Sequence, residues 1–213
     1  MSSFEGQSDP PSGGPFAGKP ENRGGDVVWR QHPAPLDRAI LWHPAQEATA
    51  PHSGRDYLRF ITLGALKEIA LHVNTESDQG KLGFLTGLSF SCPNSRVRYV
   101  VIDATLQDPL PVRDDRTSEA VTMLWVSLQE QLRLRNRQLL GWYHTHPAGG
   151  LRLTASDIVT HSRFFSAPWQ VAMLLEPGAE RSRAVVCELG DEKPPNTVLL
   201  PFYELLEPAA LVT

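Results

Sequence analysis

Residues 141–157 carry the densest chemical information in the chain and read Gly141-Trp142-Tyr143-His144-Thr145-His146-Pro147-Ala148-Gly149-Gly150-Leu151-Arg152-Leu153-Thr154-Ala155-Ser156-Asp157. In an extended segment, side chains two residues apart point to the same side, so His144 and His146 can converge on one point. Asp157 adds a carboxylate. Two imidazoles and a carboxylate form a three-ligand zinc set, and catalytic zinc sites leave the fourth position to water. The stretch therefore predicts the metal centre of a hydrolase, or of a protein descended from one.

The residues around this stretch explain how its side chains could meet. Residues 138–143 are typical of a short strand that leads into His144, and residues 147–150 contain the proline and glycines of a turn. Residues 155–164 favour a helix that starts at Thr154, which places Asp157 in its first turn. Two histidines near a helix start are also common on protein surfaces, and H-x-H alone is a weak signal. The added proline, threonine and aspartate favour the metal site.

Length and composition exclude several classes of protein. The chain has 213 residues and 41% hydrophobic residues, which suggests one domain with a tail. A net charge of −4 gives no reason to expect nucleic acid or an acidic membrane as a partner. Cys92 and Cys187 are far apart and form no C-x-x-C motif, so we expect a reducing, cytoplasmic location. No apolar run is long enough to span a membrane or to serve as a signal peptide.

The chain divides into three predicted parts. Residues 1–25 are rich in Gly, Pro and Ser and predict a disordered tail. Residues 26–55 mix short apolar pieces with prolines, and either an irregular arm or an added edge strand fits them. Residues 56–213 predict an α+β domain with a mostly antiparallel mixed sheet flanked by helices. Strands are expected at 57–61, 82–90, 96–102, 138–143, 169–175, 183–189 and 197–205. Helices are expected at 63–73 and 155–164, and a further helix with Thr117 or Ser118 as its N-cap residue.

The spacing H-x-H, seven residues, Ser, two residues, Asp resembles the motif of the JAMM metalloproteases, also called the JAB or MPN domain. His144, His146 and Asp157 match it, and Thr154 replaces the serine while keeping a hydroxyl. The resemblance covers roughly residues 55–206 and is to a minimal, bacterial-type member. It implies a fold of cytidine-deaminase-like architecture, a Zn²⁺ cofactor and an oxyanion contact from Thr154. It also implies cleavage of a peptide or isopeptide bond at the C-terminus of a ubiquitin-like or sulfur-carrier protein.

The chain departs from this family at the general base. The family glutamate stands three residues before the first glycine of a G-x-L-x-G strand, which here is Gly83-Phe84-Leu85-Thr86-Gly87, so Gly80 occupies its position. Three readings stay open. A shifted loop could bring Glu76 or Asp78 to the water; glycine could have replaced the base and left a weak enzyme; or the domain could be a non-catalytic binding or scaffold module. Zinc-dependent hydrolysis of a small molecule is a further alternative.

Other properties are less constrained. His161 follows Asp157 by four residues, and we expect a partly exposed helix residue rather than a partner of the metal site. Trp142 is expected in the core. The resemblance implies pairing with a second copy or with a related domain. The substrate, the oligomeric state and the role of residues 1–55 stay undetermined at this stage.

Overall fold

The structure is a computed structural model, and it describes residues 27–44, 57–74, 80–113, 115–146, 150–176, 183–190, 193 and 195–206. The predicted disordered tail and the candidate bases Glu76 and Asp78 lie outside these residues. The elements in chain order are β1 (Arg30–Gln31), η1 (Leu36–Arg38), β2 (Ala39–Trp42), β3 (Tyr57–Thr62), α1 (Leu63–Val73), β4 (Leu82–Ser91), β5 (Arg98–Gln107), α2 (Thr117–Leu134), β6 (Gln138–Thr145), α3 (Ala155–Phe164), β7 (Val171–Glu176), β8 (Arg183–Leu189), β9 (Thr197–Leu200) and β10 (Phe202–Leu205).

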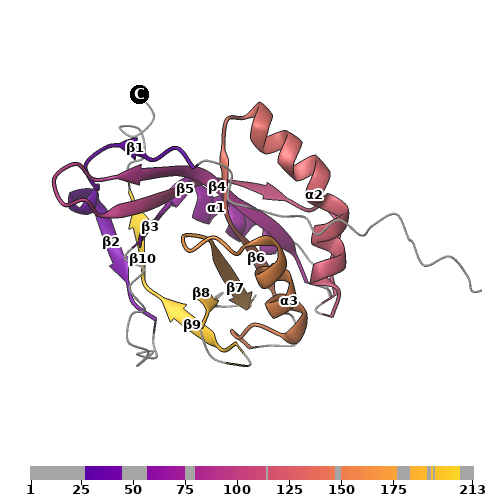
Figure 1. Cartoon of the computed structure of the whole chain (residues 1–213). Coiled ribbons are helices and arrows are strands. Elements are labelled where there is room, and N and C mark those ends of the chain that lie inside the picture. Colours follow the sequence, from indigo (N-terminus) through magenta and orange to yellow (C-terminus); the bar gives the residue numbers. More distant parts are fainter. Residues whose placement is uncertain are drawn as a thin grey trace, which may run out of the picture.

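The strands form one curled, mixed sheet (Figure 1). Its order is β2-β10-β3-β5-β4-β6-β7-β8-β9, with β1 beside β4. Within the described residues, five of the nine strand pairings are antiparallel. The predicted α+β fold with a mixed sheet flanked by helices is confirmed. The single strand expected at 197–205 is wrong, because Pro201 divides it into β9 beside β8 and β10 between β2 and β3.

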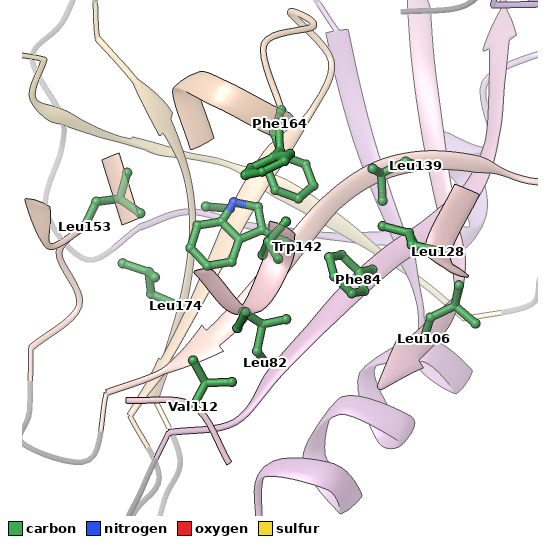
Figure 2. Packing of buried hydrophobic residues seen from close by; sticks show 14 of the residues in the cluster. Leu82, Phe84, Leu106, Val112, Leu128, Leu139, Trp142, Leu153, Phe164 and Leu174 are labelled. Carbon is green, nitrogen blue, oxygen red and sulfur yellow. The ribbon is translucent and has the colours of Figure 1, made fainter. Parts of the chain in front are cut away.

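Helices cover both faces of this sheet (Figure 1). One face packs on α1 through Ala65, Ile69 and Val73, which recur every fourth residue and are buried. The other face packs on α2 and α3. Figure 2 shows the core on that face, with Trp142 of β6 surrounded by Leu82, Leu174 and Phe164. Trp142 is 0% exposed, as its expected core position requires.

Helix α2 begins differently from the prediction. The N-cap residue is Arg116, and neither Thr117 nor Ser118 caps the helix. The hydroxyl of Thr117 instead lies 2.7 Å from the hydroxyl of Ser156 on α3, and Thr160 donates to Thr117 at 3.2 Å. These bonds join the start of α2 to the helix that carries Asp157. No helix in the described residues is long and apolar enough to cross a membrane.

Residues 27–44 resolve the choice between an irregular arm and an added edge strand. Both descriptions apply in part: β2 pairs with β10 at the sheet edge, and β1 makes a short parallel pairing with β4. Trp29, just before β1, packs on the domain, since its ring stacks on Tyr57 with centroids 5.7 Å apart and meets Trp169 edge-on at 5.5 Å. The arm thus extends the sheet and covers its margin.

Candidate metal centre

His144 and His146 lie where β6 ends, between β4 and β7. His144 pairs with Leu82 of β4 and Leu174 of β7, and its ring stacks on Trp142 with centroids 6.1 Å apart. The backbone N–H of His146 donates to the carbonyl of Leu175 at 3.1 Å, which continues the pairing with β7 by one residue. The two histidines are 0% and 3% exposed. Their positions therefore depend on the central sheet rather than on a surface loop.

Asp157 is held by the first turn of α3. Thr154 is the N-cap residue, and its hydroxyl accepts from the Asp157 N–H at 3.2 Å. In return, Asp157 Oδ2 accepts from the Thr154 N–H at 2.9 Å and from its hydroxyl at 2.8 Å. This is a capping box, in which two residues satisfy each other's helix-end groups. The same bonds fix the direction of the carboxylate and engage the hydroxyl that the family resemblance assigns to the oxyanion.

The structure brings the three predicted ligands together. One ligand atom from each of His144, His146 and Asp157 lies within 4.8 Å of the others. His144 Nδ1 is 3.3 Å from Asp157 Oδ1, and His146 Nε2 is 3.0 Å from Asp157 Oδ2. The predicted convergence is confirmed, and the group has the donor set that zinc takes in catalytic sites.

The hydrogen bonds of His146 show that this donor set suits a cation. Its Nδ1 lies 3.0 Å from the carbonyl oxygen of Gly150, which can only accept, so Nδ1 carries the proton. In a neutral imidazole Nε2 is then an acceptor, yet it faces a carboxylate oxygen 3.0 Å away. Two acceptors this close are stabilised only by a proton or a metal ion between them. Asp157 Oδ1 is also buried, and it lies 3.3 Å from His144 Nδ1.

The electrostatics of Asp157 agree with this arrangement. Burial by itself raises the pKa of a carboxyl, but hydrogen bonding to His144 and His146 outweighs burial and holds the pKa of Asp157 well below its usual range. The side chain is therefore an anion at neutral pH, with 0% of its surface exposed. A buried anion among imidazoles is the environment in which a divalent metal ion binds.

His161 is part of the support of the site, which corrects the expectation of a partly exposed residue. It is 5% exposed, and its Nδ1 accepts from the Trp142 indole N–H at 3.2 Å. Burial lowers the pKa of His161 to about 4, so the ring is neutral at pH 7 and can accept this bond. Trp142 in turn stacks on His144. The spacing of four residues places His161 and Asp157 on one helical face. Nothing in the sequence, however, shows that Trp142 connects His161 to His144.

Gly80 lies directly against the metal centre. A Cβ atom at this residue would approach Thr145 O and Val112 O to 2.7 Å and His144 Nε2 to 2.8 Å. Such distances do not occur for real Cβ atoms, so this backbone admits no side chain at the position that matches the family glutamate. None of the three readings of the missing base places a side chain at position 80, so this close packing is compatible with all three.

A hollow in the surface lies beside the capping box of α3. Thr154 borders an open hollow of about 520 Å³ between the segment before α2 and the start of α3. Its lining residues are Asp115, Ser118, Thr154, Ala155, Ser156 and Val159. Because Thr154 is bonded to Asp157 and also borders the hollow, a ligand there would lie beside the metal centre.

Comparisons with known proteins agree with the fold and the site. Residues 61–167, which include all three predicted ligands, match the sequence model of a family described as JAB1/Mov34/MPN/PAD-1 ubiquitin protease. A search of curated proteins found no match. The solution structure of protein DSY2949 from Desulfitobacterium hafniense is similar with a TM-score of 0.52 at 14% identity, over 70% of this chain and 94% of that one. At this identity the likeness concerns the fold alone.

Proposed function

The chain belongs to the JAB1/Mov34/MPN/PAD-1 family, and from this membership we propose that it is a zinc-dependent peptidase or isopeptidase. The observation that carries the proposal is the buried group of His144, His146 and Asp157, in which an imidazole nitrogen and a carboxylate oxygen face each other at 3.0 Å. Zinc bound by these residues would polarise a carbonyl group and make water more acidic, which is the chemistry that amide hydrolysis needs.

The residues around the ligands have separate roles in this proposal. The Gly150 carbonyl holds His146 in one tautomer, and Trp142 supports the ring of His144. Thr154 holds Asp157 through the capping box. For Thr154 to stabilise the oxyanion of the tetrahedral intermediate, its hydroxyl proton must turn from Asp157 Oδ2 toward the substrate oxygen. The backbone N–H of Thr154 still holds the carboxylate after that rotation, so the ligand keeps its place.

The proposed substrate is the C-terminal tail of a ubiquitin-like or sulfur-carrier protein. This class follows from the family, and the open hollow beside Thr154 would give an extended chain a place next to the residue that holds Asp157. Water adds to the acyl carbon, the C–N bond breaks, and the products are a free carboxylate and an amine. We place this reaction in the cytoplasm, where the two buried thiols of Cys92 and Cys187 would stay reduced. A second copy or a related domain is proposed as a structural partner.

One observation favours a second function. Gly80 stands where the family has its general base, and the space around it is closed. Loss of a positioned general base lowers a rate by about 10²- to 10⁴-fold. The same fold could then bind a ubiquitin-like tail at the zinc site without cutting it.

The deciding experiment uses the zinc-loaded full chain and fusions in which a peptide follows the C-terminal glycine of a ubiquitin-like or sulfur-carrier protein. Mass spectrometry identifies the cleaved bond. His146→Ala should abolish cleavage and zinc binding, whereas His43→Ala, an exposed histidine on the N-terminal arm, should leave both intact. A wild type that holds one zinc ion and binds the tails without cleaving any of them would support the binding module instead.

A further inference from the structure

The strand register identifies two residues that flank His146. On β4, Leu82 pairs with His144 and the Lys81 carbonyl accepts from the Thr145 N–H at 3.0 Å, so the next position beside His146 is Gly80. On β7, Leu174 pairs with His144 and Leu175 with Thr145. The His146 N–H donates to the Leu175 carbonyl at 3.1 Å, as a parallel ladder requires when the next pair joins residues 146 and 176. Gly80 and Glu176 therefore lie on opposite sides of His146.

Glu176 also lies on the correct face of the sheet. Alternate residues of a strand point to the same face. Ala172 and Leu174 of β7 belong to the core cluster of Trp142, which is the face of α2, α3 and the metal ligands. Glu176 is two residues further along the same row and is partly buried. Neighbouring strands are about 4.8 Å apart, a distance that a glutamate side chain spans easily.

We propose that Glu176 is the general base of this site, and that it takes over the task of the glutamate that Gly80 lacks. The proposed base adjoins His146 from β7, whereas the family glutamate would adjoin it from β4. On the β4 side, backbone atoms close the space around Gly80. Glu176 is not among the three residues of the candidate metal group, so it is placed as a neighbour of the reacting water rather than as a ligand.

Another described carboxylate at this edge of the sheet fits less well. Asp108 follows β5 and its N–H donates to Leu82 O at 3.0 Å, so two strand spacings separate it from His144. Its Oδ1 accepts from the Leu110 N–H at 3.0 Å, which directs the carboxylate toward its own loop. Glu176 is one strand spacing from His146 and is the last residue of β7.

The proposal rests on the proposed hydrolysis and completes its proton balance. As the oxygen of water bonds to the acyl carbon, a water proton passes to the Glu176 carboxylate. The carboxyl then gives this proton to the amide nitrogen as the C–N bond breaks, and the amine leaves. Glu176 ends the cycle ionised, and one water has been consumed. Thr154 contributes only a hydrogen bond to the oxyanion.

The first test compares single-turnover cleavage and zinc binding in three sets of variants. Glu176→Gln should slow cleavage by about 10²- to 10⁴-fold while still binding one zinc ion, because the carboxylate is not a ligand. Glu130→Gln, an exposed glutamate on α2, should cleave at the wild-type rate. Glu76→Gln and Asp78→Asn report on the rival bases. The inference is overturned by a Glu176→Gln protein that cleaves like the wild type, or by a larger loss in either rival variant.

The second test needs no turnover. In protein labelled with ¹³C at glutamate carboxyl carbons, the Glu176 signal is assigned by its loss in Glu176→Gln. Replacing zinc by paramagnetic Co²⁺ should shift or broaden this signal far more than that of Glu188 or Glu204. An unperturbed Glu176 signal beside a strongly perturbed Glu76 signal overturns the inference. A wild type that cleaves nothing defeats the proposed function instead, and is recognised because it fails before any variant is compared.

Discussion

Two histidines on opposite faces of the sheet are anchored alike and yet differ in their surroundings. One ring nitrogen of each lies against a backbone carbonyl: His72 Nε2 is 3.1 Å from Asp108 O, and His146 Nδ1 is 3.0 Å from Gly150 O. The other nitrogen of His72 meets a hydroxyl donor, Tyr143, at 2.7 Å. The other nitrogen of His146 meets a carboxylate acceptor, Asp157. Donors and acceptors match around His72, whereas those around His146 match only when a cation is present.

The largest effect is expected from Asp157→Asn, which removes the carboxylate that faces His146 Nε2. In Asp157→Asn the atom at the Oδ2 position cannot both donate to His146 Nε2 as an N–H₂ group and accept from the Thr154 N–H and hydroxyl as an oxygen. The zinc-free variant should therefore lose one of these contacts and be less stable than the zinc-free wild type by about 1 kcal/mol. Zinc at 1,000 times its Kd stabilises a folded site by about 4 kcal/mol, which for a chain of this size raises Tm by about 8–16 °C. We expect this rise in the wild type and its loss in Asp157→Asn.

Thermal unfolding with and without zinc measures both quantities. A variant that keeps the full zinc-dependent rise in Tm would show that Asp157 is not a ligand. The contrast between His146 and His72 would then have no bearing on metal binding. A zinc-free variant as stable as the zinc-free wild type would show that the Thr154 bonds to Asp157 Oδ2 contribute little to stability.

His161, which accepts from Trp142 beside the candidate metal site, predicts that the stability of the fold depends on pH. Burial lowers the pKa of His161 in the folded protein to about 4, from an ordinary value of 6.5. The unfolded chain therefore binds more protons between these values, and stability is complete above pH 6.5 and falls as the pH drops toward 4. At about 1.4 kcal/mol per pKa unit, the loss from this residue reaches about 3 kcal/mol.

Denaturant unfolding of the zinc-free protein at pH 7 and pH 4.5 tests this dependence. His161→Gln cannot be protonated but can still accept from the Trp142 N–H, so its stability should change less over that range. Equal slopes for the variant and the wild type would mean that His161 is already protonated when the protein folds. The Trp142 N–H would then lack the neutral His161 ring as its acceptor.

Gly80 tests the closed side of the metal centre. Gly80→Ala adds only a Cβ, which must displace two backbone oxygens and His144 Nε2. Overpacking of this kind costs about 1–3 kcal/mol, and the shift of His144 should weaken zinc binding as well. Gly64→Ala is the matched control, because its Cβ would meet nothing closer than 3.8 Å. Zinc titration and denaturant unfolding of both variants separate a local clash from a general loss of glycine flexibility.

The sequence identified the three candidate ligands but not the residues that support them, for physical reasons. H-x-H on a strand and an aspartate in a capped first helical turn are local patterns, so their geometry follows from short-range periodicity. Glu176 is thirty residues from His146 and adjoins it only through the parallel pairing of β6 with β7. The contact of His161 with Trp142 also needs tertiary structure. Pro201 similarly gave no sign that its two flanking strands join opposite ends of the sheet.

The smallest expected effect is on the opposite face of β6, at Tyr143. Tyr143→Phe removes the hydroxyl that donates to His72 Nδ1, and the net loss of such a bond is about 1 kcal/mol of the free energy of unfolding. Zinc affinity should stay unchanged, because Tyr143 and His144 point to opposite faces of the strand. Denaturant unfolding and zinc titration of this variant measure the two effects separately. A large fall in zinc affinity would mean that the two faces of the sheet are coupled through the β6 backbone. His72 and His146 would then not act independently.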